Sequence, residues 1–580
     1  MDREWTPVVV AVVFGSCATA LILLKWTRNH RVQQKIQSAR NRRETSFKTA
    51  QQAVQQFKEK NPGLDMSPIL DLPLSELIDQ IRAGILQPET VLHAYMEKAL
   101  QVNSKLNCST GVLMESAKHL EEIESYKDGL LYGVPISIKE NIGFKDSDST
   151  CGVLCKLDDP AVKDSVVVTV LKSQGAIPFI KTNVPQGLLS YECSNPIYGK
   201  TVNPCNLQKT SGGSSGGEAA LISGGGSILG LGTDIGGSIR IPASFCGICG
   251  LKPTSNRISL RGLNSCLKGV KTVLSAIGPM ARDVESLALC MRALLCEKMF
   301  MLDPTVPPLP FNQKVYECSD RLRIGYFEND GYLQPSPSMA RALRETKKLL
   351  EEAGHTLVPF KPPANIKVMH EYIVRSTFAD GAATLLSNLN DGPIDPCLQA
   401  QITPYRFPGF LKKILSVILK PIYPRIAGAM DALCGIKSIA DLWKQHTNTE
   451  NYIHEVINQW NELEMDVLLC PMLGPAYNFS YCGKLTSALS YTIIYNLLNF
   501  PVGVVPVTTV TAEDEAQLKD YKGNFGDIWD KLFVKAIQGS VGLPVAVQCV
   551  ALPWQEELCL RFMREVERVC ANNKLSNNTH

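Results

Sequence analysis

A chain of 580 residues can bury one large core or several smaller ones, and its composition, 45% hydrophobic and 20% charged, is typical of a globular protein. The formal net charge of +3 gives no electrostatic reason to expect nucleic acid as a partner. The 19 cysteines lack the spacing of a secreted disulfide scaffold, which indicates reduced thiols facing the cytosol. Cys246 and Cys249 form a C-x-x-C pair with no second pair and no nearby histidine, which favours packing over a redox or zinc site.

The N-terminal residues predict a membrane anchor. Residues 7–24 carry no charge, and as a helix they would span about 27 Å, close to the thickness of a bilayer core. Trp5 and Trp26 flank the apolar run, and seven basic residues follow between positions 25 and 43. No cleavage site follows the run, which favours an uncleaved anchor over a signal peptide. We therefore expect a single-pass anchor at residues 1–30 of an endomembrane protein, with the rest of the chain in the cytosol.

Residues 31–100 predict a helical connector. Good helix formers continue to residue 60, where Asn61-Pro62-Gly63 breaks the pattern. Two further segments, 74–84 and 88–101, place apolar residues at three- and four-residue spacing, and Pro88 suits the first turn of the second helix. We expect these helices to pack on a larger catalytic domain, placed at residues 101–580.

The pattern of that domain predicts α/β architecture. Short apolar runs such as GVPISI, AIPFI, VLLC and VGVVPVTTV alternate with helical segments such as SLALCMRALLC. This order predicts a single large domain in which helices cover a mixed sheet.

Lys139 is a candidate base. If GVPISIK is a strand, Ser137 and Lys139 share one face and Lys139 stands at the strand's polar end, where it could enter a cleft. Burial disfavours the charged form of lysine and could make it a base near neutral pH. Taken alone, however, a lysine of this kind is more often a surface residue.

The segment from Ser211 to Gly250 contains 13 glycines in 40 residues. Glycine lets main-chain N–H groups approach a ligand closely, as an oxyanion site requires. Ser214 and Ser238 both lie among these glycines. Without further context, such serines are more often turn residues than catalysts.

An alternative interpretation makes Ser214 the nucleophile of an α/β-hydrolase, since residues 212–216 fit G-x-S-x-G. In α/β-hydrolases the nucleophilic serine stands on a sharp turn, the nucleophile elbow, directly after a hydrophobic strand. The segment before Ser214, NPCNLQKT, has no apolar run that could form such a strand. It also needs an acid and a histidine downstream. The candidate histidines are His355, His370, His446, His454 and His580.

A membrane-surface segment is expected at residues 407–426. Between positions 410 and 422 the large apolar residues recur on one helical face, while lysines lie elsewhere. Such a helix suits a membrane surface, and burial of the same face in the core is the equally weighted alternative.

Two motifs together carry a resemblance to a known family. The stretch from Gly212 to Pro253 closely resembles the amidase signature, and PISIKEN resembles that family's catalytic-lysine strand. The resemblance extends from about residue 73 to about residue 567. The anchor and the segments LDPTVPPLPF, YKGNFGDIWD and ALPWQEELCLRFMREVE are similar to the vertebrate branch that acts on fatty acid amides.

The resemblance implies an amidase-signature fold and a Ser-Ser-Lys triad. It makes Ser238 the acylated nucleophile, Ser214 the bridging hydroxyl and Lys139 the base. Main-chain N–H groups of residues 235–238 would form the oxyanion hole, and Leu188 and Ser190 would lie at the edge of the acyl pocket. The implied substrate-binding set is Leu188, Ser190, Ser214, Ile235, Gly236, Gly237 and Ser238.

The resemblance also implies the substrate class. Expected substrates are N-acylethanolamines and primary fatty amides such as oleamide, cleaved through an acyl-enzyme to a free fatty acid plus an amine or ammonia, with esterase activity besides. It implies a homodimer in the endoplasmic reticulum membrane and needs no metal or organic cofactor. The rival interpretations are the histidine-dependent hydrolase and a catalytically silent lipid-binding protein.

Overall fold

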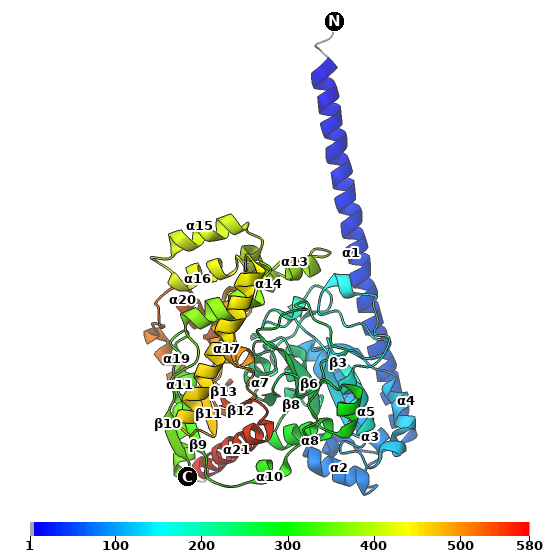
Figure 1. Cartoon of the computed structure of the whole chain (residues 1–580). Coiled ribbons are helices and arrows are strands. Elements are labelled where there is room, and N and C mark those ends of the chain that lie inside the picture. Colours follow the sequence, from blue (N-terminus) through cyan, green and yellow to red (C-terminus); the bar gives the residue numbers. More distant parts are fainter. Residues whose placement is uncertain (1–4, 579–580) are drawn as a thin grey trace.

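The computed structural model describes residues 5–578 (Figure 1). Its strands are β1 (Ser109–Val112), β2 (Pro135–Lys139), β3 (Ile177–Thr182), β4 (Ser194–Asn195), β5 (Gly199–Lys200), β6 (Leu229–Asp234), β7 (Cys249–Lys252), β8 (Ala276–Ala281), β9 (Arg323–Tyr326), β10 (Thr356–Pro359), β11 (Val467–Pro471), β12 (Val502–Thr509) and β13 (Pro544–Val550).

The α-helices are α1 (Trp5–Lys60), α2 (Leu74–Arg82), α3 (Pro88–Leu106), α4 (Ser116–Glu121), α5 (Val166–Ser173), α6 (Gly216–Ser223), α7 (Arg240–Cys246), α8 (Val284–Leu294), α9 (Glu297–Leu302), α10 (Gln313–Glu317), α11 (Pro337–Glu352), α12 (Arg375–Thr377), α13 (Ala383–Leu389), α14 (Pro396–Tyr405), α15 (Gly409–Leu419), α16 (Pro424–Ala432), α17 (Ile439–Glu462), α18 (Ser490–Leu497), α19 (Ala512–Gln517), α20 (Ile528–Ile537) and α21 (Glu556–Asn578).

One large mixed sheet organises the body. Eleven strands lie in the order β1-β3-β2-β6-β8-β7-β12-β13-β11-β9-β10, and β4 and β5 form a separate hairpin. The β3-β2-β6 group and the β11-β9-β10 group are parallel, whereas the central strands pair antiparallel. Helices flank the sheet: α6 packs against β2, β3 and β6, and α21 against β12 and β13. The predicted α/β fold is confirmed.

Local sequence explains the strands near the site. Every residue of β2 and of β6 is buried, so both faces of these strands are covered, including the face of β2 that carries Ser137 and Lys139. The runs read as strands from the sequence correspond to β2, β3, β11 and β12, and SLALCMRALLC corresponds to α8. Pro88 occupies the first turn of α3, where its missing N–H leaves no bond unmade.

Helix α1 joins the predicted anchor to the predicted connector without interruption. It ends at Lys60, directly before the Asn61-Pro62-Gly63 break. By length and composition it is the helix among the described residues that could span a membrane, with a window of mean hydropathy 1.8 that is 0% buried. Its C-terminal half packs against the body through Ala50, Val54 and Phe57. Residues between Ala50 and Ala99 thus contribute to the main core, and the boundaries at residues 30 and 100 stay predictions.

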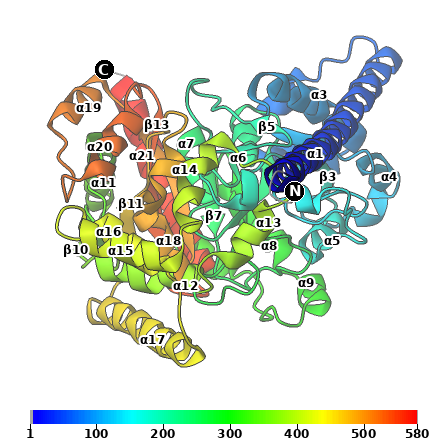
Figure 2. The same ribbon diagram turned by 90° about the horizontal axis from the view of Figure 1, so that it is seen from above.

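Helix α15 presents its apolar side to the exterior. Phe410, Ile414 and Ile418 are 70%, 50% and 63% exposed, whereas Lys412 and Ser416 are buried. The Lys412 ammonium group donates a hydrogen bond to the Leu433 carbonyl at 3.0 Å. The alternative in which this apolar face fills the core is therefore wrong for the described chain. Figure 1 shows α15 at the end of the body from which α1 projects, and Figure 2, viewed from that end, shows α15 beside α16.

Candidate active site

The candidate site lies where two parallel strands end. Lys139 is the last residue of β2 and Asp234 the last residue of β6, and the two strands are neighbours, with Ile138 opposite Leu231. Because parallel strands deliver their carboxyl ends to the same edge, residues there converge although they are far apart in sequence. The loop that leads into α6 carries Ser214 to this edge.

Lys139 is enclosed by hydroxyl and carbonyl groups. Its side chain is 0% exposed. The Nζ atom lies 2.7 Å from Ser214 Oγ, 2.8 Å from Thr233 Oγ1 and 3.1 Å from the Thr233 carbonyl oxygen. A neutral amine has two N–H groups and one lone pair, so at least one of the two hydroxyls must donate to the nitrogen when the lysine is uncharged. Ser214 is therefore placed to exchange a proton with Lys139.

The environment favours the neutral form of this lysine. Burial lowers the pKa of Lys139 from 10.5 to about 7, and the negative charge of Asp234 opposes that change only in part. A charged ammonium group loses its hydration when it is enclosed, and three polar contacts do not fully replace it. At neutral pH a substantial fraction of Lys139 is therefore an unprotonated base.

The two serines are held in one backbone arrangement. The N–H of Ser215 donates to the carbonyl of Ser238 at 3.0 Å, which fixes the two glycine-rich loops against each other. Ser214 is buried at 2% exposure, whereas Ser238 is half-buried and lines the cavity described below. Lys139 thus contacts Ser214, the loop of Ser214 is bonded to Ser238, and Ser238 lines the cavity.

The loop before Ser238 has a constrained backbone. Gly237 has φ of 121°, a conformation that disfavours residues with a side chain, and a Cβ there would lie 2.6 Å from Thr492 Oγ1. The Gly237 N–H donates to Asp234 Oδ1 at 2.8 Å, so this amide already has a partner. The oxyanion prediction consequently depends on the N–H groups of Ile235, Gly236 and Ser238.

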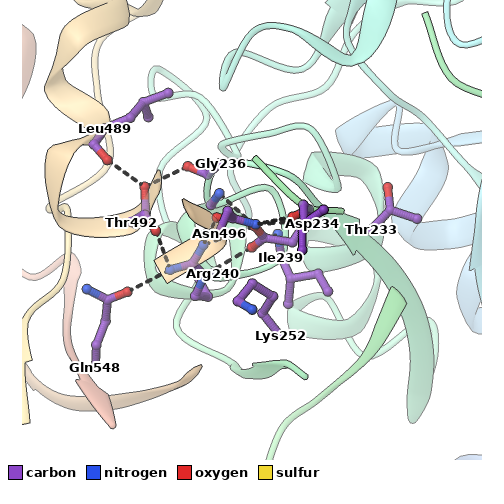
Figure 3. A network of polar contacts seen from close by, with 12 residues as sticks. Thr233, Asp234, Gly236, Ile239, Arg240, Lys252, Leu489, Thr492, Asn496 and Gln548 are labelled. Atoms are coloured by element: carbon purple, nitrogen blue, oxygen red, sulfur yellow. Dashed lines mark hydrogen bonds and ion pairs between the residues drawn. The ribbon is translucent and has the colours of Figure 1, made fainter. Parts of the chain in front are cut away.

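A buried ion pair supports the same loop (Figure 3). Arg240 donates to both carboxylate oxygens of Asp234, at 3.0 and 3.1 Å. Its remaining N–H groups reach the Thr492 carbonyl at 2.8 Å, the Asn496 side chain at 2.7 Å and the Gln548 side chain at 3.2 Å. Burial alone would raise the pKa of Asp234, but the adjacent guanidinium holds that pKa below its usual value. The carboxylate therefore stays charged and keeps its bonds to the loop.

Helix α18 completes this support. The hydroxyl of Thr492 lies 2.7 Å from the Gly236 carbonyl and 3.0 Å from the Leu489 carbonyl. Asn496 donates to the Asp234 carbonyl at 3.3 Å and to the Leu274 carbonyl at 3.0 Å. These contacts hold the Asp234–Ile235 and Gly236–Gly237 peptide groups in place.

A largely apolar cavity of about 360 Å³ opens at Ser238. Leu188, Ser190, Ile235 and Gly236 line it, as predicted for substrate contacts, whereas Ser214 and Gly237 are not among its lining residues. Apolar side chains from distant parts of the chain also line it: Ile241, Met369, Ile373, Phe378, Met430 and Trp529. The cavity extends to α16 through Ile426, Ala429 and Met430, and α16 packs against the outward apolar helix α15.

Two of the candidate histidines, His355 and His370, have partners away from Ser214. The His370 ring nitrogen lies 3.1 Å from the Tyr332 hydroxyl, and that of His355 lies 3.1 Å from Glu565. Within residues 5–578, Ser214 has Lys139 and no histidine as a hydrogen-bond partner. This geometry disfavours the elbow interpretation. The remaining candidates are His446 and His454 on α17, and His580, which lies outside the described residues.

Cys246 and Cys249 are both buried and unbridged. Cys246 contacts the Ser211 carbonyl and Cys249 the Glu567 carboxyl group. Burial raises the pKa of both thiols, which disfavours the reactive thiolate. The pair has the contacts of packing residues.

Sequence reasoning missed the residues that support the site. Thr233 contacts Lys139, and Thr492 and Asn496 hold the loop from more than 250 residues away in the chain. The only available signal was the presence of two opposite charges, Asp234 and Arg240, within an otherwise glycine-rich and apolar motif. Nothing in the segment around Thr492 distinguishes it from an ordinary core helix.

Comparison with known proteins agrees with this geometry. The model of the family described as Amidase matches residues 90–560. The chain belongs to the amidase family. It is 53% identical over 561 residues to fatty-acid amide hydrolase 1 of Sus scrofa, covering 97% of this chain and 96% of that one. It is 38% identical over 539 residues to fatty acid amide hydrolase 1 of Caenorhabditis elegans, covering 91% and 93%.

Solved structures support the assignment of this amidase. A fatty acid amide hydrolase superposes with a TM-score of 0.77 at 25% identity, covering 94% of this chain and 96% of that one. A bacterial aryl acylamidase of the amidase signature family, 19% identical, shares the fold with a TM-score of 0.64 over 86% and 96% of the two chains. The predicted amidase-signature fold is confirmed, and the chain is a hydrolase of amide bonds.

Proposed function

We propose that this amidase is a membrane-bound serine hydrolase of fatty acid amides. Relatives named for that activity match nearly its full length, and the cavity at Ser238 is lined mainly by apolar side chains that suit a long acyl chain. The proposed substrates are N-acylethanolamines and primary fatty amides such as oleamide. The products are a free fatty acid and an amine or ammonia.

One observation carries the proposal: a fully buried lysine with a pKa lowered to about 7 lies 2.7 Å from the Ser214 hydroxyl, and the adjacent Ser215 N–H bonds the carbonyl of Ser238, which lines an apolar cavity. Lys139 forms no direct ion pair with any described residue, and a buried cation without one is unfavourable for a structural role alone. Its enclosure by hydroxyls is instead what a general base requires.

Acylation begins with two coupled proton transfers. Neutral Lys139 accepts the proton of Ser214 while Ser214 accepts that of Ser238, and Ser238 Oγ forms a bond to the substrate carbonyl carbon. The main-chain N–H groups of Ile235, Gly236 and Ser238 stabilise the negative charge that develops on the carbonyl oxygen.

Attack on the carbonyl carbon gives a tetrahedral intermediate, and its breakdown uses the same groups in reverse. The protonated lysine returns a proton to Ser214, which passes its own proton to the departing nitrogen as the C–N bond breaks. The amine leaves neutral and an ester of Ser238 remains. Water, deprotonated through the same relay, then attacks the ester and releases the fatty acid.

The membrane association in this proposal rests on two exposed apolar segments. The N-terminal part of α1 is apolar and not packed against the body, and α15 exposes Phe410, Ile414 and Ile418 at the same end of the molecule (Figure 1). A single bilayer could contact both segments. The cavity reaches α16 beneath α15, which gives a lipid amide a route from the bilayer to Ser238.

The basic residues that follow the apolar part of α1 support a cytosolic catalytic domain, since Lys and Arg flanks favour the cytoplasmic side. We assign the protein on this basis to an endomembrane, with the endoplasmic reticulum as the proposed site. A homodimer is proposed from the family resemblance.

Reaction with a fluorophosphonate followed by mass-spectrometric mapping tests the nucleophile. We expect the adduct on Ser238, its loss in Ser238→Ala, and retention in Ser215→Ala as the matched control within the same loops. An adduct on Ser214 would support the elbow mechanism instead. Absence of any adduct on folded protein would favour a lipid-binding protein without catalysis.

A further inference from the structure

A second pocket lies among α12, α15, α16 and α17. Its volume is about 620 Å³, and it shares no lining residue with the catalytic cavity. That volume is in the range of small-molecule sites. It opens beside α15, at the end of the molecule where the apolar part of α1 projects (Figure 1).

The lining of this pocket is cationic in balance. It contains the positively charged Arg375, Lys413, Lys437 and Lys444 and the negatively charged Asp431 and Asp441. Asp431 accepts from Arg375 at 2.6 Å and from Lys413 at 2.5 Å, so it is already shared between two cations. Arg375 also pairs at 2.8 Å with Glu371, which lies outside the lining, so the lysines of the pocket left without an ion pair among the described residues are Lys437 and Lys444.

Lys437 and Lys444 are the uncompensated cations. Both are exposed, and neither forms an ion pair with any residue in the part of the chain that the structure describes. The remaining carboxylate, Asp441, accepts a hydrogen bond from Ser438 at 2.7 Å in the cap of α17. The start of that helix adds further positive potential.

The rim of the pocket is apolar. Phe410 lines it and is 70% exposed; Ile439 and Trp443, which are not lining residues but neighbour Asp441 and Lys444 in the first turns of α17, are 69% and 68% exposed. Exposed tryptophan beside lysine is typical of residues that lie at the headgroup level of a bilayer. A cationic pocket with an apolar rim fits an amphiphilic anion better than a free inorganic ion.

We propose that this pocket binds the phosphate-bearing headgroup of an anionic phospholipid. The inference rests on the proposed contact between α15 and a membrane, which would bring headgroups to the level of Lys437 and Lys444. The phosphate would lie near the two lysines while the acyl chains follow Phe410 and Trp443 into the bilayer. Such a lipid would hold α15 and α16 in a fixed orientation over the entrance to the catalytic cavity.

A basic pocket beside α1 supports the same partner independently. It has a volume of about 590 Å³ and includes Arg28, Arg31 and Lys35 with one acidic residue, Asp391. Leu24, at the end of the apolar run, forms its outer edge. Two cationic pockets that each adjoin an exposed apolar segment are the arrangement expected for an anionic bilayer surface.

The test uses the full-length protein in nonionic detergent micelles, titrated by microscale thermophoresis with dioctanoyl-phosphatidylglycerol, dioctanoyl-phosphatidylcholine and inorganic phosphate. We expect the anionic lipid to bind at least tenfold more tightly than the zwitterionic one. Lys437→Gln/Lys444→Gln should weaken the anionic lipid about tenfold, or about 1.4 kcal/mol. The matched control is Lys118→Gln/Lys314→Gln on α4 and α10, which should bind as the unmodified chain does.

Equal affinity for the two lipids, or no effect of Lys437→Gln/Lys444→Gln, would overturn the inference. Competition by inorganic phosphate at the concentration of the phospholipid would also overturn it, because the site would then bind free phosphate. Hydrolysis of a soluble short-chain amide is measured in parallel and should be unchanged in both variants. Failure of the proposed enzymatic function would appear there, separately from lipid binding.

Discussion

Lys139 can act as a base because its side chain is buried, and not simply because it is a lysine. An ordinary lysine is protonated at neutral pH, but here burial lowers the pKa to about 7 while Ser214 and Thr233 contact the nitrogen. The same burial that makes the amine a base also makes the proton it accepts easy to return. A relay that must donate to a leaving amine needs both properties.

Lys139→Ala should therefore slow amides more than esters. Proton transfer by a positioned group contributes about 10²- to 10⁴-fold. Without a proton the nitrogen of an amide would have to leave as an anion, whereas an ester can release an alkoxide more readily. We expect kcat/KM for a short-chain amide to fall at least tenfold further than that for the matched ester. The two losses are compared on one preparation whose folding is checked by thermal melting. Equal losses would contradict the relay.

The pH dependence follows from the lowered pKa of Lys139. Below about pH 7 the lysine is protonated and cannot accept a proton, so kcat/KM for an amide should rise through about pH 7 and level off above it. Glu218 is the matched control, because burial raises its pKa to about 7 as well. The inflection should persist in Glu218→Gln. Its disappearance there would assign the titration to Glu218.

Thr492 is a positioning residue that does not touch the proton relay. Thr492→Val keeps the shape of the side chain but removes the hydroxyl beside the Gly236 carbonyl, freeing the oxyanion loop. We expect kcat to fall about tenfold with little change in KM, because small misplacements of catalytic groups are costly. Thr492→Ser should restore the rate. A rise in KM, or a loss that follows the melting temperature, would indicate a packing role instead.

At the scale of elements, α15 differs from most amphipathic helices in facing its apolar side outward. Its buried residues are the polar Lys412 and Ser416, held by the Leu433 carbonyl and neighbouring helices. The helix is thereby anchored through its polar side, which leaves the apolar side available to a membrane. This arrangement separates the stability of α15 from its surface contacts.

Ile414→Asp/Ile418→Asp on α15 tests that separation. Both side chains are exposed, so the free energy of unfolding should change by no more than about 0.5 kcal/mol per site. Hydrolysis of a long-chain amide in vesicles should fall severalfold, while hydrolysis of a soluble short-chain amide stays unchanged. Val162→Asp/Val541→Asp, in two exposed loops, is the matched control. Equal losses on both substrates would place the effect in the catalytic body rather than at the membrane.

At the scale of the whole molecule, α1 serves two environments. Its N-terminal part makes no contact with the core, whereas its C-terminal part contributes Ala50, Val54 and Phe57 to the main core and Ile36 and Ala39 to a smaller cluster. The helix therefore links the body rigidly to the apolar segment rather than through a flexible tether.

Two truncations should distinguish these parts of α1. Removal of residues 1–30 should leave the melting temperature within a few degrees and preserve hydrolysis of soluble amides. Removal of residues 1–60 should destabilise the protein by roughly 5 kcal/mol, because burying each large apolar side chain contributes about 1.5–3 kcal/mol. Thermal melting of both proteins checks this. Equal stability would show that the packing of Val54 and Phe57 contributes nothing.

Much of the fold could be predicted from local patterns. Short apolar runs identified β2, β3, β11 and β12 because those strands are buried on both faces and need no partner to be recognised. The strand order could not be predicted from local patterns, because strands such as β7 and β12 pair although almost half of the chain separates them in sequence. Lys139, Ser214 and Ser238 could be proposed as catalytic residues because each stands in a short recognisable motif. Thr492 could not be proposed as a supporting residue because its segment contains no such motif.

By itself, the sequence determined which groups are chemically available: an apolar N-terminal run, a lysine at a strand end, and two serines among glycines. These depend on neighbours within a few residues. Only the tertiary structure decided that Lys139 is buried and that the Gly237 N–H donates to Asp234. It also decided that the apolar face of α15 is exposed. Burial, and with it pKa and exposure, is set by segments hundreds of residues away, which no local pattern contains.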